Sequence, residues 1–276
     1  NPLSQAGPLE FLLGMAIHHD RKNSILKISQ ETRIQALLER HNMSNCHGVS
    51  TPLPDGEKVT STGCPTNADE EYALAKECNF DTYADMVTYV RGLIGVYGYL
   101  SCCGRPDIRF ATYFMARYQS RPSKRHYQLV KRMMRYLQQT KDLCLIFNPA
   151  NSVNDLLKMG LQDEHPLYGM VDSNYTNAED TKSTTGYVFY LYGCPIVCES
   201  KKQRATCHST TESELIAASL AARRCNYLRR LLEQDFGLKL PSTPIGEDNQ
   251  GCIDVSRGGG SHARMRHIHV ADSYID

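Results

Sequence analysis

A chain of 276 residues with 41% hydrophobic and 22% charged side chains can bury one large core or two moderate ones, which excludes disorder throughout. No N-terminal signal pattern is visible, and no run approaches 18 apolar residues, so secretion and membrane spanning are disfavoured. The eleven cysteines fit neither a zinc ribbon nor a disulfide framework, so free thiols in a reducing compartment are expected.

The net charge of +1 conceals an uneven distribution along the chain. Residues 117–141 contain eight Lys or Arg and no acid, whereas residues 55–85 contain eight acids and two lysines. This asymmetry favours a polyanion as the partner of the basic segment, with a solvated helix face as the alternative.

The N-terminal part is predicted to form a hairpin, a helix and a connector. Residues 9–20 and 24–31 have the composition of two strands joined by a polar turn. Residues 31–43 follow with apolar side chains at helical spacing. Residues 48–67 are rich in Pro, Gly and Thr without a period, which indicates an exposed connector.

Three helices are predicted next, over residues 83–103, 107–119 and 123–140. Each interior glycine costs a helix about 1 kcal/mol relative to alanine, and the first helix has three of them at three-residue spacing. This stripe predicts close approach of a neighbouring helix or of a nucleic acid. The third helix is basic on its outer face, where we place Lys124, Lys131, Arg132 and Arg135.

Beyond residue 141 the chain changes to strand-like segments. Four strands are predicted, at residues 143–149, 167–174, 183–193 and 194–202. A long helix ending before Gly237, a strand at 242–248 and a helix at 249–258 follow. This order predicts an α+β fold in which a mixed sheet is flanked by helices.

The segment "CHSTTESELIAAS" contains two glutamates where one would serve a helix start. Ser209 with Glu212, and Thr211 with Glu214, both fit a capping box, but a helix has a single N-cap. If Thr211 is the N-cap and Glu214 is the carboxylate of its capping box, Glu212 lies in the first turn without a structural role.

Two further acids follow apolar strands. Asp172 lies at the end of one, and Asp248 ends another directly before a helix, where N-capping is the alternative role. If these two acids converged with Glu212, they would repel each other unless cations bound them. Oxygen-only ligand sets suit Mg²⁺ or Mn²⁺, and a pair of such ions promotes phosphodiester hydrolysis.

Several blocks of the sequence resemble Ty1/copia-type retrotransposon polyproteins. "LYGMVDSNYTNAEDTKSTTGYVFYLYGCPIVCESKKQ", "HSTTESELIAAS", "PIGEDNQGCID" and "HARMRHIH" resemble the ribonuclease H domain, and "RGLIGVYGYLSCCGRPDIRFAT" and "KRMMRYLQQTKDL" resemble the reverse transcriptase segment before it. The resemblance divides the chain into the end of the palm with its primer-grip hairpin (1–47), a connector (48–80), a helical thumb-like region (81–142) and a ribonuclease H-like domain (143–276).

The resemblance implies a two-metal nuclease site. Asp172, Glu212 and Asp248 match the family's first three acids and would hold two Mg²⁺, with Mn²⁺ as a substitute, while Glu214 would be the helix-start residue. The fourth acid of the family falls on His269, which weakens a site built on charge. Asp272 is a candidate replacement for it.

The resemblance also implies a nucleic-acid path. The close-approach face for a template–primer duplex would be Arg91, Gly92 and Gly95, with phosphate contacts from Lys131, Arg132 and Arg135. Near the nuclease site, the candidates for contact with the DNA strand are Lys182, Lys201, Lys202 and Arg204, with ordinary turn positions as the alternative. Other expected partners are the remainder of the palm and an adjacent integrase. The expected location is cytoplasmic, in virus-like particles, with the nucleus as the alternative.

Three functions are weighed. The first is hydrolysis of the RNA strand of an RNA–DNA hybrid, without DNA synthesis, because the Tyr-x-Asp-Asp motif of the polymerase is absent from these residues. The second is a nucleic-acid-binding remnant that no longer cleaves. The third is a scaffold within the polyprotein, against which the exposed basic helix argues.

Overall fold

The computed structural model describes residues 9–57, 60–148, 165–175 and 182–256. Its contacts divide the chain into two units, Asn1–Ile146 and Phe147–Asp276. The fold is α+β, as predicted. No helix in the parts of the chain that the structure describes has both the length and the apolar character needed to cross a membrane.

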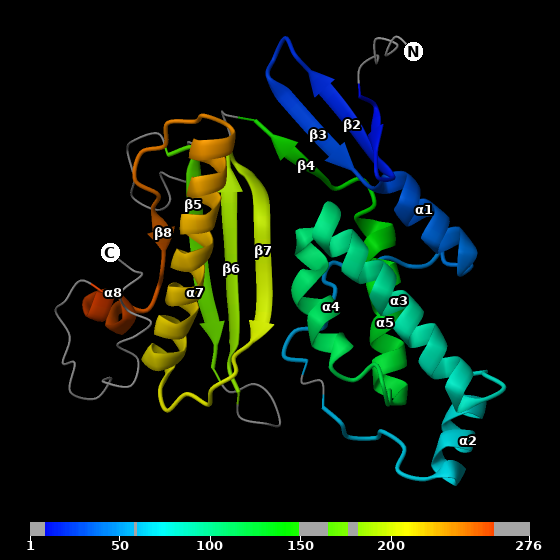
Figure 1. Cartoon of the computed structure of the whole chain (residues 1–276). Coiled ribbons are helices and arrows are strands. Elements are labelled where there is room, and N and C mark those ends of the chain that lie inside the picture. Colours follow the sequence, from blue (N-terminus) through cyan, green and yellow to red (C-terminus); the bar gives the residue numbers. More distant parts are fainter. Residues whose placement is uncertain (1–8, 58–59, 149–164, 176–181, 257–276) are drawn as a thin grey trace, which may run out of the picture. The chain divides into compact units, whose positions relative to one another are not determined.

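A small sheet opens the first unit (Figure 1). Its strands, in the order β1-β2-β3-β4, are Phe11–Leu12, Met15–Asp20, Ile25–Ser29 and Cys144–Phe147. The predicted hairpin is confirmed, because β2 and β3 pair antiparallel from Ala16↔Ser29 to Asp20↔Ile25. The predicted first strand is in fact two, since Leu13 and Gly14 have positive φ and turn the chain back on itself.

Helices form the rest of the first unit. They are α1 (Glu31–Arg40), α2 (Ala68–Glu77), α3 (Tyr83–Cys103), the short η1 (Pro106–Ile108), α4 (Arg109–Ala116) and α5 (Lys124–Gln139). Ile34, Leu93 and Met134 lie in one buried core that α1, α3, α4 and α5 share. The Tyr97 hydroxyl donates to the Val130 carbonyl at 2.7 Å, so the one polar atom of this buried ring is satisfied.

Sequence reasoning missed α2, which lies between the connector of residues 48–67 and the next predicted helix, and inside the 48–80 connector that the resemblance implies. The signal was present: Asn67 caps the helix by accepting a hydrogen bond from the N–H of Glu70 at 2.9 Å. Asp69, Glu70 and Glu71 occupy the first turn and Lys76 the last, as the helix dipole favours. The start of the connector, residues 49–54, is largely half-buried rather than exposed, because Val49 and Leu53 pack against the helical core.

The second unit is built on a mixed sheet. Its strands are β5 (Leu167–Asn174), β6 (Thr184–Leu191), β7 (Cys194–Lys202) and β8 (Ile245–Gly246), in the order β7-β6-β5-β8. The first three pair antiparallel, whereas β8 is parallel to β5. Antiparallel strands need only tight turns, but a parallel strand needs a long crossover, which here contains a helix.

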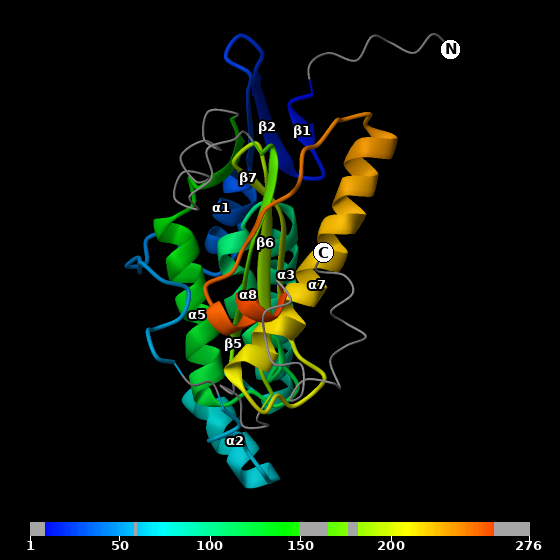
Figure 2. The same cartoon turned by 90° about the vertical axis from the view of Figure 1, so that its left-hand side faces the viewer.

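That helix is α7 (Thr210–Arg230), which runs across one face of the sheet (Figures 1 and 2). Ala217, Ala221 and Cys225 pack against Val171 and Phe189 of the strands. A π-helical turn, Leu231–Asp235, extends α7 to Gly237, whose positive φ of 67° ends it as predicted. The short helix α8 (Gln250–Ser256) follows β8.

Candidate active site

Acidic side chains gather at one end of the second unit's sheet. Asp172 lies near the carboxyl end of β5, and Asp248 follows the carboxyl end of β8 by two residues. The parallel pairing of these strands puts their carboxyl ends at the same end of the sheet. The amino end of α7 reaches the same end of the sheet (Figure 1).

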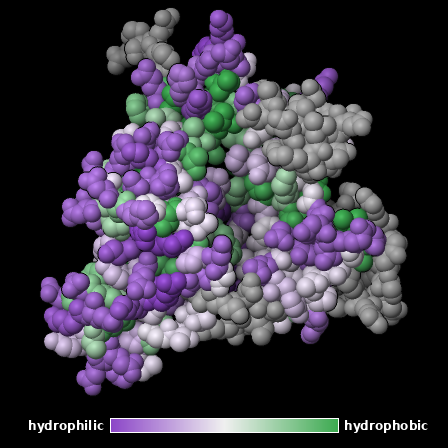
Figure 3. All heavy atoms as spheres, turned by 180° about the vertical axis from the view of Figure 1, so that it is seen from behind, coloured by the Kyte–Doolittle hydropathy of each residue, from purple (hydrophilic) through white to green (hydrophobic). Residues whose placement is uncertain are grey.

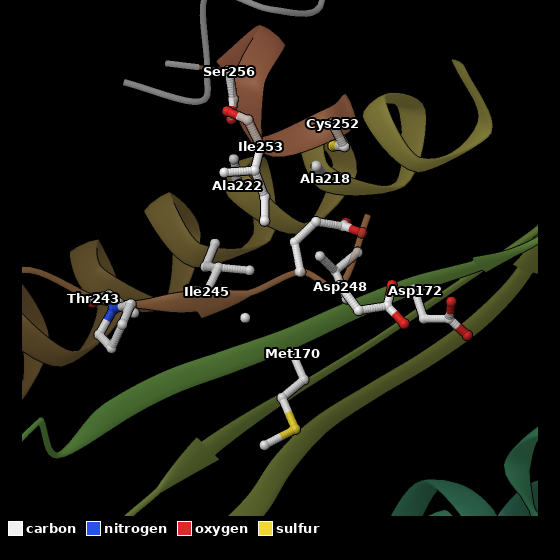
Figure 4. A pocket seen from close by; sticks show the side chains of 14 residues that line it. Met170, Asp172, Ala218, Ala222, Thr243, Ile245, Asp248, Cys252, Ile253 and Ser256 are labelled. Atoms are coloured by element: carbon white, nitrogen blue, oxygen red, sulfur yellow. The ribbon is translucent and has the colours of Figure 1, made fainter. Parts of the chain in front are cut away.

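Asp172 and Asp248 line one pocket of about 790 Å³. Figure 4 shows their carboxylates, from β5 and from the segment after β8, at the same end of it. The rest of the wall is largely apolar, and includes Met170, Ala218 and Ile253. The pocket therefore has an acidic end, and both of these aspartates are exposed to solvent there.

The structure contradicts the predicted cap at the start of α7. Ser209, not Thr211, is the N-cap, and its hydroxyl accepts from the N–H of Glu212 at 3.1 Å. The Glu212 carboxylate accepts from the N–H of His208 at 2.7 Å, so it stabilises the helix start. The prediction that Glu214 has this role is wrong, and Asp172 and Asp248 instead contribute to raising the pKa of Glu214.

The surroundings of Glu214 are those of a carboxyl that resists ionisation. Only 6% of the residue is exposed, and burial together with Glu247, Asp172 and Asp248 raises its pKa to about 7, against a lowering by a hydrogen bond with Ser173. Its Oε2 atom is buried and has no hydrogen-bond partner among the described residues.

Glu247 is a further acid that sequence reasoning missed. Burial raises its pKa, and Asp248 and Asp172 raise it further, whereas the N–H of Asn249 lowers it by donating to Oε1 at 3.0 Å. Its position directly before Asp248, at the end of a strand, is the sequence signal that could have identified it.

A buried polar network supports the first turn of α7. The side-chain amide of Gln203 donates to the Ser213 carbonyl at 2.9 Å and to the Thr185 hydroxyl at 3.0 Å. The Cys207 thiol donates to Gln203 Oε1 at 2.9 Å. The hydroxyls of Ser173 and Ser213 share a hydrogen bond of 2.5 Å. Because these serines adjoin Asp172 and Glu214 in sequence, the network fixes the backbone beside both acids.

The donor set is consistent with a hard divalent cation. Carboxylate oxygens are the ligands that Mg²⁺ and Mn²⁺ prefer, and the Oε2 atom of Glu214 lacks a partner that a cation would supply. No three His, Cys, Asp or Glu side chains in the described ranges are grouped closely enough to form a ready cation cluster. The predicted fourth position, His269, and its candidate replacement Asp272 lie outside the described residues.

The four basic residues that are predicted to contact DNA lie at the acidic end of the sheet. Register pairs Lys201 with Thr185 and Lys202 with Thr184, opposite the Ser173–Asn174 end of β5. Lys182 precedes β6 and Arg204 follows β7, which places both at this end. The structure thus brings the basic group and Asp172 to one end of the sheet, although the sequence separates them.

In the first unit, the predicted phosphate-contacting residues are largely engaged by the protein itself. Arg132 donates to the Thr51 hydroxyl at 2.9 Å and Arg135 to the His47 carbonyl at 2.7 Å, so both hold the chain around residues 47–51 on α5. The ammonium of Lys131 lies 5.3 Å from the Tyr127 ring centre. Figure 3 views this unit from the side of α5, where the surface is mostly hydrophilic. The basic side chains on the outer face of α5 therefore bind another segment of this chain, around residues 47–51.

The glycine stripe of α3 faces open space. A Cβ atom added at Gly92 or Gly95 would meet no heavy atom within 4 Å, so no neighbouring helix in the described residues explains these glycines. Arg91 lies beside them and donates to the Gln119 carbonyl at 3.3 Å. The stripe is available for close approach by another molecule.

Comparison with known proteins finds relatives over nearly the whole chain. It is 34% identical over 274 residues to the retrovirus-related Pol polyprotein from transposon TNT 1-94 of Nicotiana tabacum, covering 99% of this chain and 19% of that protein. It is 27% identical over 270 residues to the retrovirus-related Pol polyprotein from transposon RE1 of Arabidopsis thaliana, covering 97% and 16%.

A relative of another kind covers less of the chain. The secreted RxLR effector protein 161 of Plasmopara viticola is 33% identical over 136 residues, which is 49% of this chain and 87% of that protein. The chain spans less than a fifth of the length of the two polyproteins. No family model and no solved structure matches it.

Proposed function

Because the chain is homologous over nearly its whole length to the Pol polyproteins of copia-type transposons, we propose that its second unit hydrolyses the RNA strand of RNA–DNA hybrids. One observation carries the proposal. Asp172, near the end of β5, and Asp248, after β8, line one end of a pocket, and both contribute to raising the pKa of Glu214, which lies near the start of α7. Such like-charge clustering is typical of sites that bind cations.

Each carboxylate has a distinct part in the proposed chemistry. A divalent cation bound here would supply an activated water and stabilise charge on the leaving oxygen of a phosphodiester. Asp172 and Asp248 are exposed, so they would hold a cation where substrate phosphate could reach it. Glu214 is buried, with a hydrogen bond from the Ser173 hydroxyl that orients its carboxylate. Glu212 and Ser209 keep the first turn of α7 in register.

The basic side chains near the acids support a nucleic-acid substrate. Lys182, Lys201, Lys202 and Arg204 lie at the same end of the sheet and would contact phosphates, which gives affinity that depends on salt but little on sequence. An RNA strand would be distinguished from DNA through its 2′-hydroxyls. In the first unit, the open stripe at Gly92 and Gly95 is the proposed surface for a template–primer duplex.

The proposed partners extend to the rest of the polyprotein. The chain lacks the Tyr-x-Asp-Asp motif in its 276 residues, so we propose that DNA synthesis requires the palm encoded elsewhere in such polyproteins. An adjacent integrase is a further proposed neighbour, and virus-like particles in the cytoplasm are the proposed location.

Cleavage of an end-labelled RNA–DNA hybrid in Mg²⁺ or Mn²⁺ tests the proposal. Wild-type cleavage that Asp172→Asn abolishes would support it, and a gain with His269→Asp would show that histidine weakens the fourth position. Double-stranded DNA of the same sequence is the control substrate and is expected to remain intact. An intact hybrid in both metals, with wild type and His269→Asp alike, would refute the proposal.

A second candidate is a nucleic-acid-binding remnant without cleavage. His269 at the predicted acid position favours it, as does the lack of a ready three-ligand cluster among the described residues. This candidate predicts hybrid binding that weakens with salt while the RNA strand stays whole. A scaffold without a nucleic-acid role predicts no salt-dependent binding at all.

A further inference from the structure

The helix α4 presents two aromatic side chains to solvent. Phe110 is 43% exposed and Tyr113 is 41% exposed, although Ala111 and Thr112 between them are buried. Residues three apart lie on the same side of an α-helix, so both rings share one exposed side of α4, which we call the aromatic face. Large apolar rings gain free energy when they are covered, so their grouping on one face indicates a surface that binds another molecule.

Arginine side chains flank both rings. The Arg109 guanidinium lies 5.0 Å from the centre of the Tyr113 ring. The Phe110 ring stacks on the Phe114 ring with centroids 5.4 Å apart, and the Arg117 guanidinium lies 5.0 Å from the centre of the Phe114 ring. Such cation–π and ring contacts are attractive, so the rings and the positive charges are arranged together before any ligand binds.

The aromatic face continues onto α3, which lies beside α4 (Figure 1). Arg109 donates to the Cys102 sulfur of α3 at 3.4 Å, and Arg91 of α3 donates to the Gln119 carbonyl beyond the end of α4 at 3.3 Å. Arg91, Gly95 and Cys102 are exposed and recur at helical spacing, so they share one side of α3. The open surface at Gly95 therefore lies between the two points at which the helices are joined.

The charge of this region suits an anion. Asp107 is the only Asp or Glu in residues 86–141, and it is paired with the buried Arg105 at 2.7 Å. A phosphate-bearing strand at the aromatic face would meet arginines without an unpaired carboxylate from these residues. A second copy of this chain would instead bring like charges together, which disfavours self-association through this face.

We propose that the aromatic face of α4 stacks the unpaired bases of a single-stranded nucleic acid, with Arg109 in contact with its phosphates. Every base has a π-face, so stacking on Phe110 and Tyr113 tolerates any sequence, and nearby arginines add cation–π and phosphate contacts. The site belongs to the first unit and needs no cleavage, so it goes beyond the proposed hydrolysis. A single strand bound here would continue the duplex that is proposed to lie on the glycine stripe.

Tryptophan fluorescence tests stacking directly, because the chain contains no tryptophan. Tyr113→Trp places a single indole on the aromatic face. Tyr72→Trp is the matched control, since Tyr72 is 64% exposed with the Lys76 ammonium 5.6 Å from its ring centre, but lies on the acidic helix α2. A single-stranded DNA of about 12 nucleotides is expected to quench the first variant and not the second.

Fluorescence anisotropy of the same strand, labelled at one end, measures the affinity of the full chain. Tyr113→Ala is expected to raise the Kd at least about fivefold, because one base–aromatic stack is lost. Tyr113→Phe and Tyr72→Ala should retain the wild-type Kd. The slope of log K against log salt should be unchanged in Tyr113→Ala and smaller by about 0.7 in Arg109→Gln, which removes one phosphate contact. An RNA strand of the same sequence should bind alike, since stacking does not involve the 2′-hydroxyl.

Three results would overturn the inference. The first is an unquenched Tyr113→Trp, which retains a large ring and decides the question even where Tyr113→Ala does not fold. The second is a folded Tyr113→Ala with the wild-type Kd, folding being checked by circular dichroism. The third is a wild-type dimer that Tyr113→Ala dissociates, since the aromatic face would then be a protein interface. None of these readouts involves cleavage, so an intact hybrid in the nuclease assay bears on the proposed function alone.

Discussion

The Glu212 carboxylate accepts the backbone N–H of His208 at 2.7 Å, across the turn that leads into α7. This bond joins the residue before the N-cap to the first turn of the helix, and it gives Glu212 a structural role. Glu214, two residues later, is about 200° further around the helix and faces a different set of neighbours. We therefore expect Glu214, rather than Glu212, to serve the proposed chemistry.

Substitution of each glutamate in turn distinguishes a structural role from a role in cleavage. Glu214→Gln is expected to lower hybrid cleavage at least about 100-fold, because it removes a charge from the acidic cluster. Glu212→Ala is expected to retain most of the cleavage and to lower the free energy of unfolding by about 1 kcal/mol, as loss of a helix-start contact does. Initial cleavage rates and urea unfolding measure the two effects. Loss of cleavage in Glu212→Gln, with Glu214→Gln active, would restore the assignment from sequence.

Stability of the cation-free chain should fall as the pH rises. The pKa of Glu214 increases from 4.5 to about 7 on folding, so the folded state binds more protons than the unfolded state between these values. Its stabilising contribution is complete below about pH 4.5 and is lost as the pH rises through about 7. The raised pKa of Glu247 acts in the same direction.

Thermal unfolding in a chelator, from about pH 5 to about pH 8, checks this expectation. Glu214→Gln should flatten the decline, whereas Asp254→Asn, at an exposed position, should retain it. A wild-type Tm that rises across this range would contradict the prediction, since the sign follows from the direction of the pKa shift.

Gln203 is expected to matter more than its polar side chain suggests. It is 4% exposed and joins the end of β7 to the Ser213 carbonyl and the Thr185 hydroxyl. Gln203→Met keeps the volume but leaves a buried carbonyl without its donor, which should cost about 1–3 kcal/mol. Gln250→Met, at an exposed position in α8, should change the unfolding free energy by less than about 0.5 kcal/mol. Equal unfolding midpoints in urea for these two variants would show that the network is dispensable.

Gly95 offers a test of the open stripe on α3. Alanine there meets no heavy atom within 4 Å, so Gly95→Ala should stabilise the helix by about 0.5–1 kcal/mol. If a duplex approaches the stripe closely, the same methyl group should weaken duplex binding. Fluorescence anisotropy with a labelled template–primer measures the affinity, and urea unfolding the stability. A more stable variant with unchanged affinity would remove the stripe from the proposed duplex path.

Much of the architecture could be read from the sequence, because short-range patterns specify it. Strand periodicity and turns predicted β2, β3 and the β5–β7 meander, and Asp172 and Asp248 could be recognised at strand ends. The helix α2 also has local signals, an N-cap residue and an acidic first turn, so the sequence contained enough information to predict it.

The sequence alone could not choose between Glu212 and Glu214, since Ser209 and Thr211 give each glutamate an equally good capping partner. Packing decides, because Ala217 and Ala221 must face Val171 and Phe189, and this fixes the rotation of α7 and the residue at which it begins. The hydrogen-bond partners of Arg132 and Arg135 could not be predicted from local sequence either, because Thr51 and His47 are more than 80 residues away along the chain. Local sequence determined which segments became strands and helices, and tertiary packing determined which side chains of those elements face one another.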